Sequence, residues 1–240
     1  WGAYLAGRSG LITVPTGAGK TYAAYGGPLA EVCGDESAAG GLRVLYITPL
    51  RAVSRDIELA LKLPVEELGL PVAVESRTGD TPQSVRTRQR ARLPEVLITT
   101  PESLSLLLSY ADAPQRFAGV RSVIVDEWHE LLTSKRGTQV ELALARLRGF
   151  SPGVRTWALS ATIGNIEEAA RAAAGVGEEP VVVSGDLARP VEIETVLPRE
   201  ARELPWAGHF GLRMLPRVLE AIDPEQTTLL FVNTRAQAEL

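Results

Sequence analysis

The sequence contains little sulfur and little imidazole. Its 240 residues include one cysteine, Cys33, one methionine, Met214, and two histidines, His129 and His209. A single cysteine excludes an internal disulfide and fits a reducing compartment, so we expect a cytoplasmic protein in which Cys33 is a small, buried or half-buried apolar residue. Two histidines and one cysteine are also too few for a metal cluster built from those residue types.

Long apolar runs and an excess of basic residues are missing as well. No stretch approaches the roughly 20 apolar residues that cross a bilayer, and no secretory leader stands at the start, so we expect no membrane partner. The net charge of −4 excludes wholesale electrostatic binding to nucleic acid and leaves room only for local basic patches. The hydrophobic share of 45% is ample for a core, and the start at Trp1 leads us to expect part of a longer polypeptide.

The segment Pro15–Thr21 has the pattern of a phosphate-binding loop between a strand and a helix. An apolar run, Gly10–Val14, precedes it, and residues compatible with a helix follow it. Glycines in such a loop let successive backbone N–H groups converge on phosphate oxygens, and the start of the helix adds a positive dipole end. The loop departs from the general pattern at Val14, where a small residue is usual.

Two residues of this loop carry distinct chemistry. Lys20 is expected to reach the β- and γ-phosphates of ATP, and the Thr21 hydroxyl is expected to ligate Mg²⁺. The expected nucleotide-binding residues are Thr16, Gly17, Ala18, Gly19, Lys20 and Thr21. The alternative is a glycine-rich turn that ends by coincidence in Lys-Thr.

A pair of carboxylates follows a later apolar strand. After Val123-Ile124-Val125, Asp126 can hold Mg²⁺ through water, and Glu127 can orient and deprotonate the attacking water. Alone, the pair is equally compatible with a solvated loop. Together with the phosphate-binding loop, it predicts a nucleoside triphosphatase that uses Mg²⁺.

Apolar runs alternate with helical segments along most of the chain. The predicted strands are Gly10–Val14, Arg43–Ile47, Val72–Glu75, Val96–Thr99, Ser122–Val125, Thr156–Leu159 and Val181–Val183. The predicted helices are Gly19–Val32, Ala52–Leu68, Pro82–Arg92, Glu102–Tyr110, Val140–Arg148 and Ile166–Ala174. Strands that are apolar on both faces are typical of a sheet between two helix layers. We therefore expect an α/β, doubly wound, mostly parallel sheet with ligands at the carboxyl ends of its strands.

The pattern changes after Ser184. Leu187-Ala188-Arg189-Pro190 interrupts the alternation, and Val191–Val196 alternates like a half-exposed strand. We therefore expect one domain over residues 1–187 and, over residues 188–240, a linker with the N-terminal part of a second, truncated domain. Within that part we predict a helix over Met214–Ile222, a strand over Thr228–Val232 and a helix from about Arg235.

The motifs together resemble those of the DExH-box ATPases of helicase superfamily 2. The resemblance rests on Pro15–Thr21, on Asp126-Glu127-Trp128-His129 and on Ser160-Ala161-Thr162. Further matches in the family's order are Thr48-Pro49-Leu50-Arg51-Ala52, Arg77-Thr78-Gly79-Asp80, Thr100-Pro101-Glu102-Ser103-Leu104 and Phe231-Val232-Asn233-Thr234-Arg235. Within the superfamily, Trp128, the continuation Glu130–Gly137 and the segment Pro205–His209 look like the large helicase-related (Lhr) family, most like its bacterial ligase-associated subgroup.

The resemblance implies a RecA-like fold for both domains and assigns roles to residues. The implied catalytic residues are Lys20, Asp126, Glu127 and His129, and the implied metal ligands are Thr21 and Asp126. The residues that would couple the nucleotide to nucleic acid are His129, Ser160 and Thr162, and ordinary hydrogen-bonded loop residues are the alternative. The implied nucleic-acid-binding residues are Thr48, Arg51, Arg77, Thr78, Gly79, Thr100 and Glu102. Hydroxyls, backbone N–H groups and arginines suit a phosphate backbone that is bound without regard to sequence.

Some basic and aromatic residues have two interpretations. With Thr81-Pro82 as its N-cap and first turn, a short helix would carry Arg86, Arg88, Arg90 and Arg92 either to the nucleic-acid groove or into solvent. Arg136 either touches a phosphate or lies in solvent. Trp128 either stacks on a base or packs in the core, and packing is the more common role of such a residue.

We favour an ATP-dependent helicase or translocase on single-stranded nucleic acid, with DNA preferred to RNA and DNA-repair proteins as partners. The alternative is a nucleotide-controlled clamp or scaffold that binds nucleic acid without unwinding it. A P-loop GTPase is disfavoured because the sequence has no Asn-Lys-x-Asp motif for guanine. In this superfamily the second domain supplies arginines that complete charge stabilisation. Since only its start is here, we expect weak nucleotide binding and slow turnover by this chain alone.

Overall fold

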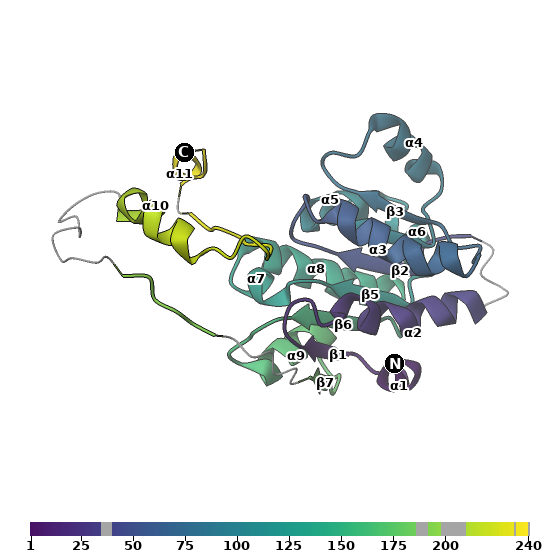
Figure 1. Ribbon diagram of the computed structural model, residues 1–240. Helices are drawn as coiled ribbons and strands as arrows, with labels where there is room; N and C mark the ends of the chain where they lie inside the picture. The colour runs from purple at the N-terminus through teal and green to yellow at the C-terminus, as the bar shows by residue number, and fades with distance from the viewer. Residues whose placement is uncertain (35–39, 186–191, 198–209, 233, 240) are drawn as a thin grey trace. The chain divides into compact units, whose positions relative to one another are not determined.

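The structure, a computed structural model, describes residues 1–34, 40–185, 192–197, 210–232 and 234–239 (Figure 1). Tertiary contacts divide the chain into two compact units, Trp1–Leu187 and Ala188–Leu240, which are described separately. The segments Leu187–Pro190 and Pro205–His209 and the residue Asn233, all singled out in the sequence, lie outside the described residues. No described helix is both long and apolar enough to span a membrane.

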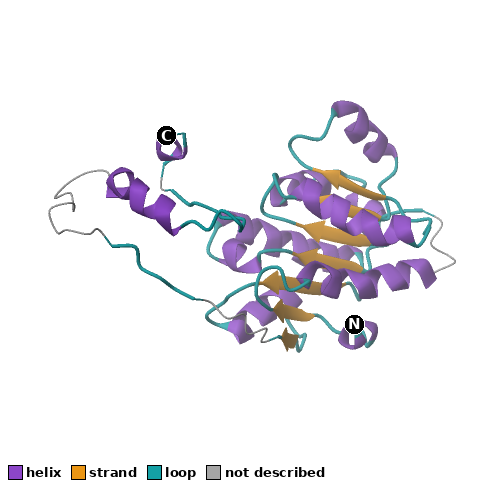
Figure 2. Cartoon of the chain, viewed as in Figure 1, coloured by secondary structure: helices purple, strands orange, loops and turns teal. Residues whose placement is uncertain are grey.

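The first unit is built on one sheet of seven parallel strands (Figure 2). In spatial order the strands are β3 (Val74–Arg77), β4 (Val96–Thr99), β2 (Val44–Ile47), β5 (Ser122–Val125), β6 (Arg155–Ser160), β1 (Gly10–Thr13) and β7 (Val181–Ser184). Every residue of β2, β4 and β5 is buried, as a parallel sheet between helix layers requires. The predicted α/β, doubly wound sheet is confirmed.

Helices cover both faces of this sheet. One layer consists of α1 (Gly2–Leu5), α2 (Lys20–Gly34) and α3 (Ser54–Glu67). The other consists of α5 (Pro101–Leu108), α6 (Ala113–Phe117), α7 (Trp128–Leu132), α8 (Lys135–Phe150) and α9 (Ile166–Ala174). A further helix, α4 (Gln83–Ala91), lies beyond the β3 edge (Figure 1). Side chains alternate along β2, so that Val44 and Tyr46 pack in the first layer and Leu45 and Ile47 in the second.

The start of β3 and the exposure of Cys33 differ from the prediction. The strand β3 begins at Val74 rather than Val72, because its pairing with β4 starts at Val74 opposite Val96. The side chain of Cys33 is exposed rather than buried, because it lies in the last turn of α2, where Val32 faces the core instead.

The expected cap of α4 is also different. Pro82 occupies the N-cap position and makes no side-chain capping bond. The Thr81 hydroxyl accepts a hydrogen bond from the backbone N–H of Thr78 at 2.9 Å instead. Thr81 therefore stabilises the turn that follows β3 rather than the start of the helix.

The described part of the second unit contains two helices, α10 (Phe210–Ala221) and α11 (Arg235–Ala238). Both predicted helices are present, although α10 begins at Phe210 rather than Met214. The strands predicted over Val191–Val196 and Thr228–Val232 are wrong for the residues described there, 192–196 and 228–232, which adopt no strand. A strand needs a neighbouring strand to pair its backbone groups, and alternating side chains do not supply one.

Candidate nucleotide and nucleic-acid sites

The carboxyl ends of the strands form one edge of the sheet, and the strand order divides this edge into two halves. On one half, β5, β6 and β1 are neighbours, and they end at Asp126, Ser160 and the phosphate-binding loop. On the other half, β3, β4 and β2 lead into Thr78, Thr100 and Thr48. The residues predicted for nucleotide chemistry and those predicted for nucleic acid thus occupy adjoining halves of one edge.

The phosphate-binding loop joins β1 to α2 with a backbone that requires its glycines. Gly17 and Gly19 have φ angles of 77° and 80°, which residues with a Cβ atom rarely adopt. The helix α2 begins at Lys20, so its positive dipole end faces the loop. Lys20 is only 8% exposed, and its Nζ donates to the carbonyl oxygen of Val14 at 3.1 Å. This bond holds the ammonium group against the loop.

The two carboxylates differ in how they are held. Asp126 continues the sheet beyond β5, because its N–H donates to the carbonyl oxygen of Ile47 at 2.8 Å. Burial raises the pKa of the Asp126 carboxyl, although hydrogen bonds to it oppose the shift. Burial and then the neighbouring charge of Asp126 raise the pKa of Glu127. A raised pKa makes Glu127 a stronger proton acceptor, as a general base requires.

The oxygen atoms at this edge fit a hard cation. The Thr21 hydroxyl and the Asp126 carboxylate could serve as the one or two protein ligands that Mg²⁺ takes beside phosphate oxygens and waters. Within the part of the chain that the structure describes, no group of three or more His, Cys, Asp or Glu side chains could hold a metal ion. The donor set therefore suits a cation that arrives with nucleotide phosphates.

One neighbour of Asp126 belongs to no motif. Tyr46 in β2 is fully buried, and its Oη donates to Asp126 Oδ2 at 2.9 Å. The sequence shows Tyr46 only as one residue of an apolar strand. The pairing of β2 with β5, which puts Tyr46 beside Ile124, would have been needed to find the contact.

The residues predicted to couple the two halves lie together. Ser160 Oγ, at the end of β6, is 3.1 Å from His129 Nδ1 in α7. The same histidine nitrogen is 3.6 Å from Glu127 Oε2. Ser160 Oγ also donates to the carbonyl oxygen of Thr162 at 3.3 Å, whereas the Thr162 side chain is exposed. The predicted base thus contacts a histidine that contacts the Ser-Ala-Thr turn.

Trp128 has a packing role in this structure. Its side chain is fully buried, and its Nε1 donates to the carbonyl oxygen of Ala169 in α9 at 3.0 Å. The ring therefore ties α7 to α9 and is not available to stack on a base.

On the other half of the edge, Arg51 and Gly79 lie against each other. A Cβ atom on Gly79 would lie 2.9 Å from the Arg51 guanidinium carbon, so any larger residue would displace the exposed arginine. The turn that contains Gly79 is held from below by Arg86, whose guanidinium donates to the carbonyl oxygens of Thr78 and Gly79. Gly79 and Arg51 thus form one exposed surface, whereas Thr78 is only 6% exposed.

Other predicted nucleic-acid residues are less accessible. Thr48 and Thr100 are each 1% exposed and Arg77 is 6% exposed. The Arg77 guanidinium donates to the backbone oxygen of Arg86 at 3.2 Å, so it supports α4 from inside. These three side chains lie beneath the surface that Arg51 and Gly79 present.

Glu102 is exposed but already has a partner. Its carboxylate accepts two hydrogen bonds from Arg136, at 2.6 and 3.1 Å, across the contact between α5 and α8. Arg136 is therefore neither free in solvent nor available to a phosphate unless this pair opens.

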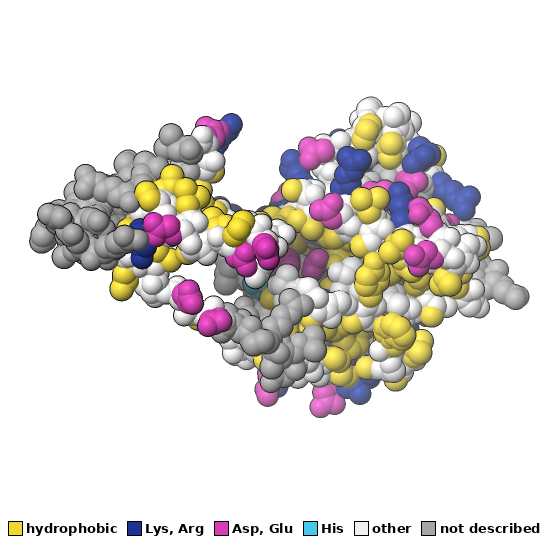
Figure 3. Space-filling view, in the orientation of Figure 1, with side chains coloured by type: hydrophobic (Ala, Val, Ile, Leu, Met, Phe, Trp, Pro, Cys, Tyr) yellow, Lys and Arg dark blue, Asp and Glu magenta, His cyan; other side chains and the backbone are white. Residues whose placement is uncertain are grey.

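The arginines of α4 and the residue after it are engaged with protein groups. Arg88 pairs with Glu75 at 2.8 Å, Arg90 with Asp112 at 2.8 Å and Arg92 with Glu95 at 3.5 Å. Figure 3 shows that basic side chains gather around the α3 and α4 end of the first unit, with acidic side chains between them. These arginines attach α4 to its surroundings rather than forming a bare basic face.

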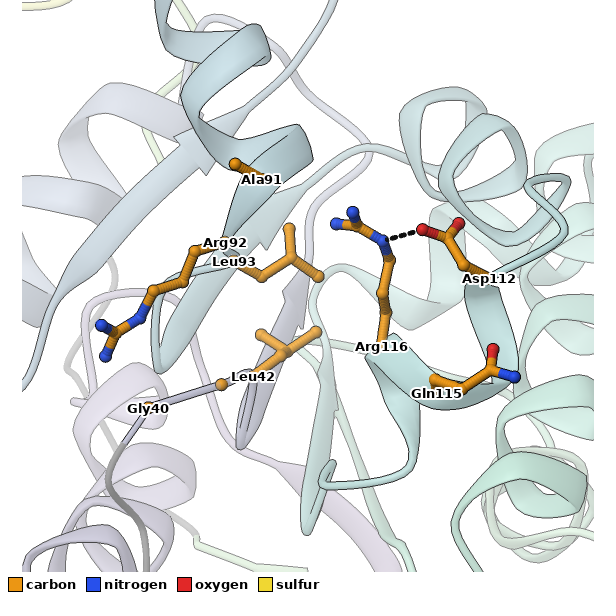
Figure 4. Close-up of a pocket in the computed structure, with 9 residues that line it drawn as sticks. Gly40, Leu42, Ala91, Arg92, Leu93, Asp112, Gln115 and Arg116 are labelled. Carbon is orange, nitrogen blue, oxygen red and sulfur yellow. Dashed lines mark hydrogen bonds and ion pairs between the residues drawn. The ribbon is translucent and has the colours of Figure 1, made fainter.

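A separate pocket of about 540 Å³ lies at the opposite edge of the sheet (Figure 4). Leu42 and Leu93, which precede β2 and β4, form part of its lining. Arg116 and Asp112, joined by a hydrogen bond of 2.7 Å, form another part. Because it lies at the amino ends of the strands, this pocket is not part of the predicted sites.

Comparisons with known proteins agree with this arrangement. Residues 1–169 match the DEAD/DEAH box helicase family model. The ATP-dependent helicase Lhr-Core of Methanocaldococcus jannaschii is 34% identical over 97% of this chain and 29% of its own length. The Lhr helicase/probable uracil glycosylase of Mycolicibacterium smegmatis is 34% identical over 100% of this chain and 16% of its own length. The chain thus spans less than a third of the length of either relative.

A solved structure extends the likeness to three dimensions. The Mycobacterium smegmatis helicase Lhr bound to single-stranded DNA and AMP-PNP has a TM-score of 0.84 and 33% identity, over all of this chain and 32% of that one. The predicted RecA-like fold and the resemblance to the Lhr helicases are confirmed, while the ligase-associated subgroup stays a prediction. With 169 of its residues matched to the family model, this chain belongs to the DEAD/DEAH box helicase family.

Proposed function

We propose that the protein containing this chain is an ATP-dependent helicase or translocase that acts on single-stranded nucleic acid, with DNA as the preferred substrate. One observation carries the proposal. A single sheet edge carries the glycine loop and the carboxylate pair on one half and the exposed Arg51 and Gly79 on the other, which supports a nucleotide site beside a nucleic-acid site. A motor that converts hydrolysis into movement needs its nucleotide site coupled to its nucleic-acid site, and neighbouring sites on one sheet edge suit such coupling.

The nucleotide half would act as follows. Lys20 binds the phosphates, Thr21 and Asp126 hold Mg²⁺, and Glu127 accepts a proton from the attacking water. When bound, Mg²⁺ neutralises charge that develops on the phosphate oxygens. The raised pKa of Glu127 supports its role as the base. His129 contacts both Glu127 and Ser160, and through these contacts ATP binding or hydrolysis could change the arrangement of residues elsewhere on the sheet edge.

The nucleic-acid half would bind the sugar-phosphate backbone. Arg51 supplies an exposed cation, and Gly79 supplies an exposed backbone N–H, which together suit binding without sequence preference. The buried side chains of Thr48, Arg77 and Thr100 would support that surface. The hydrogen-bonded pair of Glu102 and Arg136 would lie at its border. The preference for DNA, and a setting in DNA repair, rest on the likeness to an Lhr helicase whose structure was solved with single-stranded DNA.

The region after residue 187 is proposed to begin a second RecA-like domain. Residues 1–187 would then be the ATP-binding domain, and the rest of the second domain would complete the motor. This division supports the expectation that the present chain turns over ATP slowly by itself. The single cysteine supports a reducing, cytoplasmic setting.

The test is steady-state ATP hydrolysis by the full-length natural polypeptide, with and without single-stranded DNA or RNA. We expect DNA to stimulate hydrolysis and Glu127→Gln to reduce it by about 100-fold or more, because a general base contributes a factor of that order. Glu130→Gln, a change of the same kind at an exposed position of α7, should leave the rate within twofold. Full activity in Glu127→Gln would reject Glu127 as the base, and stimulation by RNA alone would reject the DNA preference.

A strand-displacement assay separates a helicase from a nucleotide-controlled clamp, because both predict stimulated hydrolysis. Release of the complementary strand that requires ATP supports the helicase. Tight, nucleotide-dependent binding without release would favour the clamp.

A further inference from the structure

Tyr46 lies at the buried centre of the nucleotide half, behind the residues that would face ATP. The strand β2 pairs with β5 along its length, which puts Tyr46 opposite Ile124, two residues before Asp126. Its side chain is on the same face of the sheet as the core residues of α2 and is 0% exposed. The ring therefore fills core space, and the hydroxyl is its only polar atom.

The hydroxyl contacts Asp126 directly. Tyr46 Oη donates to Asp126 Oδ2 at 2.9 Å, and the Glu127 N–H donates to the other carboxylate oxygen, Oδ1, at 3.0 Å. The backbone of Asp126 is held in turn by the ladder bond from its N–H to the carbonyl oxygen of Ile47. Each carboxylate oxygen thus has one fixed donor, which sets the plane and rotation of the carboxylate.

The two donors leave part of the Asp126 carboxylate free. An ionised carboxylate has about four lone-pair sites on its two oxygens. The Tyr46 hydroxyl occupies one site on Oδ2 and the Glu127 N–H occupies one on Oδ1, so each oxygen keeps a lone pair for a cation.

We infer that Tyr46 is a positioning residue of the metal site, whose hydroxyl orients the Asp126 carboxylate so that its free lone pairs face the Mg²⁺. The inference rests on the proposed function, since it concerns the cation that accompanies the nucleotide. Partners that orient metal ligands typically change metal affinity or activity by 10- to 100-fold when they are removed. Tyr46 itself cannot touch the nucleotide, because it is fully buried.

The chain offers a matched control for this hydroxyl. Tyr25 in α2 is 1% exposed and packs in the same core layer as Tyr46. Its hydroxyl is buried and has no hydrogen-bond partner. Replacing either tyrosine by phenylalanine removes one buried oxygen from the same layer, but only Tyr46→Phe removes a contact to the proposed ligand Asp126.

The test measures how strongly Mg²⁺ tightens the binding of a fluorescent, non-hydrolysable ATP analogue. The dissociation constant is measured in Mg²⁺ and in EDTA for the wild type, Tyr46→Phe and Tyr25→Phe. The temperature is kept well below the thermal unfolding midpoint that each variant has in EDTA. We expect Mg²⁺ to tighten binding by the wild type and Tyr25→Phe equally. In Tyr46→Phe the tightening should fall by 10-fold or more while binding in EDTA stays within twofold. Tyr46→Met removes the ring together with the hydroxyl and should show the same loss, which keeps the test available if the phenylalanine variant does not fold.

Other outcomes overturn the inference in distinguishable ways. Equal tightening in Tyr46→Phe and wild type would reject it and leave the proposed function intact. Equal weakening of binding in Mg²⁺ and in EDTA, or the same loss in Tyr25→Phe, would show that the hydroxyl matters only for packing. Absence of any Mg²⁺ effect in the wild type would reject the proposed nucleotide site itself.

Discussion

Glu127 is the one residue other than glycine with a positive φ angle among those the structure describes, at φ 47° and ψ 47°. The left-handed conformation arises where β5 ends in Asp126 and the chain turns into α7. For a residue with a long side chain it costs about 1–3 kcal/mol, and such strain tends to occur at functional sites. Here it falls on the proposed general base.

We predict that Glu127→Asn is more stable than Glu127→Gln by about 0.5–1 kcal/mol. Both changes remove the carboxylate and keep a neutral amide, but asparagine tolerates the left-handed region better than glutamine. Urea unfolding without nucleotide measures the difference. At Glu130, which has helical backbone in α7, the order should reverse by a few tenths of a kcal/mol, because glutamine is the better helix former. If Glu127→Gln were the more stable variant, the left-handed conformation would not strain the backbone at position 127.

At the scale of single residues, the sequence could predict what a local motif carries. Lys20 and Asp126 stand out because glycines or an apolar strand precede them, and the structure puts both at the same sheet edge. Tyr46 could not be predicted, since its contact with Asp126 joins residues 80 positions apart. The inward direction of Arg77 also depends on tertiary contacts, here with a backbone oxygen of α4.

At the scale of elements, a partly buried cluster attaches α1 and α2 to the amino end of β6. Arg155 donates to both carboxylate oxygens of Glu31 at 2.6 Å, and its guanidinium lies 4.2 Å from the centre of the Tyr4 ring. The Tyr4 hydroxyl also donates to Glu31. Burial raises the pKa of Glu31, but its hydrogen bonds to Arg155 and Tyr4 outweigh that effect, and the pKa lies below its usual value of 4.5.

We predict that Glu31→Gln lowers the free energy of unfolding by roughly 1–2 kcal/mol at pH 7, less than for a fully buried pair because the Glu31 side chain is 30% exposed. A lowered pKa in the folded state means that the stabilisation is complete above pH 4.5 and is lost as the pH falls through the folded pKa. Urea unfolding from pH 7 to pH 3 should therefore show the two proteins converge.

Glu167→Gln is the matched control for this prediction. Glu167 pairs with Arg171, but the two side chains are 80% and 69% exposed, so the change should stay within about 0.5 kcal/mol. A Glu31→Gln difference that stays constant down to pH 3 would show that packing, and not charge, is lost.

Elements were predictable where a long pattern defines them. The strand β4 and the helix α9 occur at the predicted residues, because an apolar run and a 3.6-residue period are local signals. The short helix α7 was not predicted, since five residues are too few for a period and tertiary contacts of Trp128 hold it. The strand predicted at 228–232 shows the opposite error, in which a pattern is present and a pairing partner is missing from the described residues.

At the scale of the whole molecule, the order of the strands decides which of the predicted site residues lie together, and only the succession of the strands along the chain can be read from the sequence. Chain order places β2, β3 and β4 between the phosphate-binding loop and Asp126, whereas the sheet order brings β5, β6 and β1 together. Right-handed crossovers restrict the possible orders but do not select one. The separation into two half-edges therefore became visible only in the structure.

The hydrophobic core lies within the first unit. Both hydrophobic clusters, with the residues packed against them, fall within Ala3–Val181, and every proposed nucleotide-binding residue lies before Thr162. We therefore predict that a protein of residues 1–187 unfolds cooperatively, with a midpoint within about 4 °C of the 240-residue chain, corresponding to less than about 1 kcal/mol. Its affinity for a non-hydrolysable ATP analogue in Mg²⁺ should be within threefold. Calorimetry and a fluorescence titration on both proteins test this. A truncated protein that unfolds much earlier, or that loses Mg²⁺-dependent binding, would show that residues 188–240 are part of the nucleotide-binding fold and not the start of a separate domain.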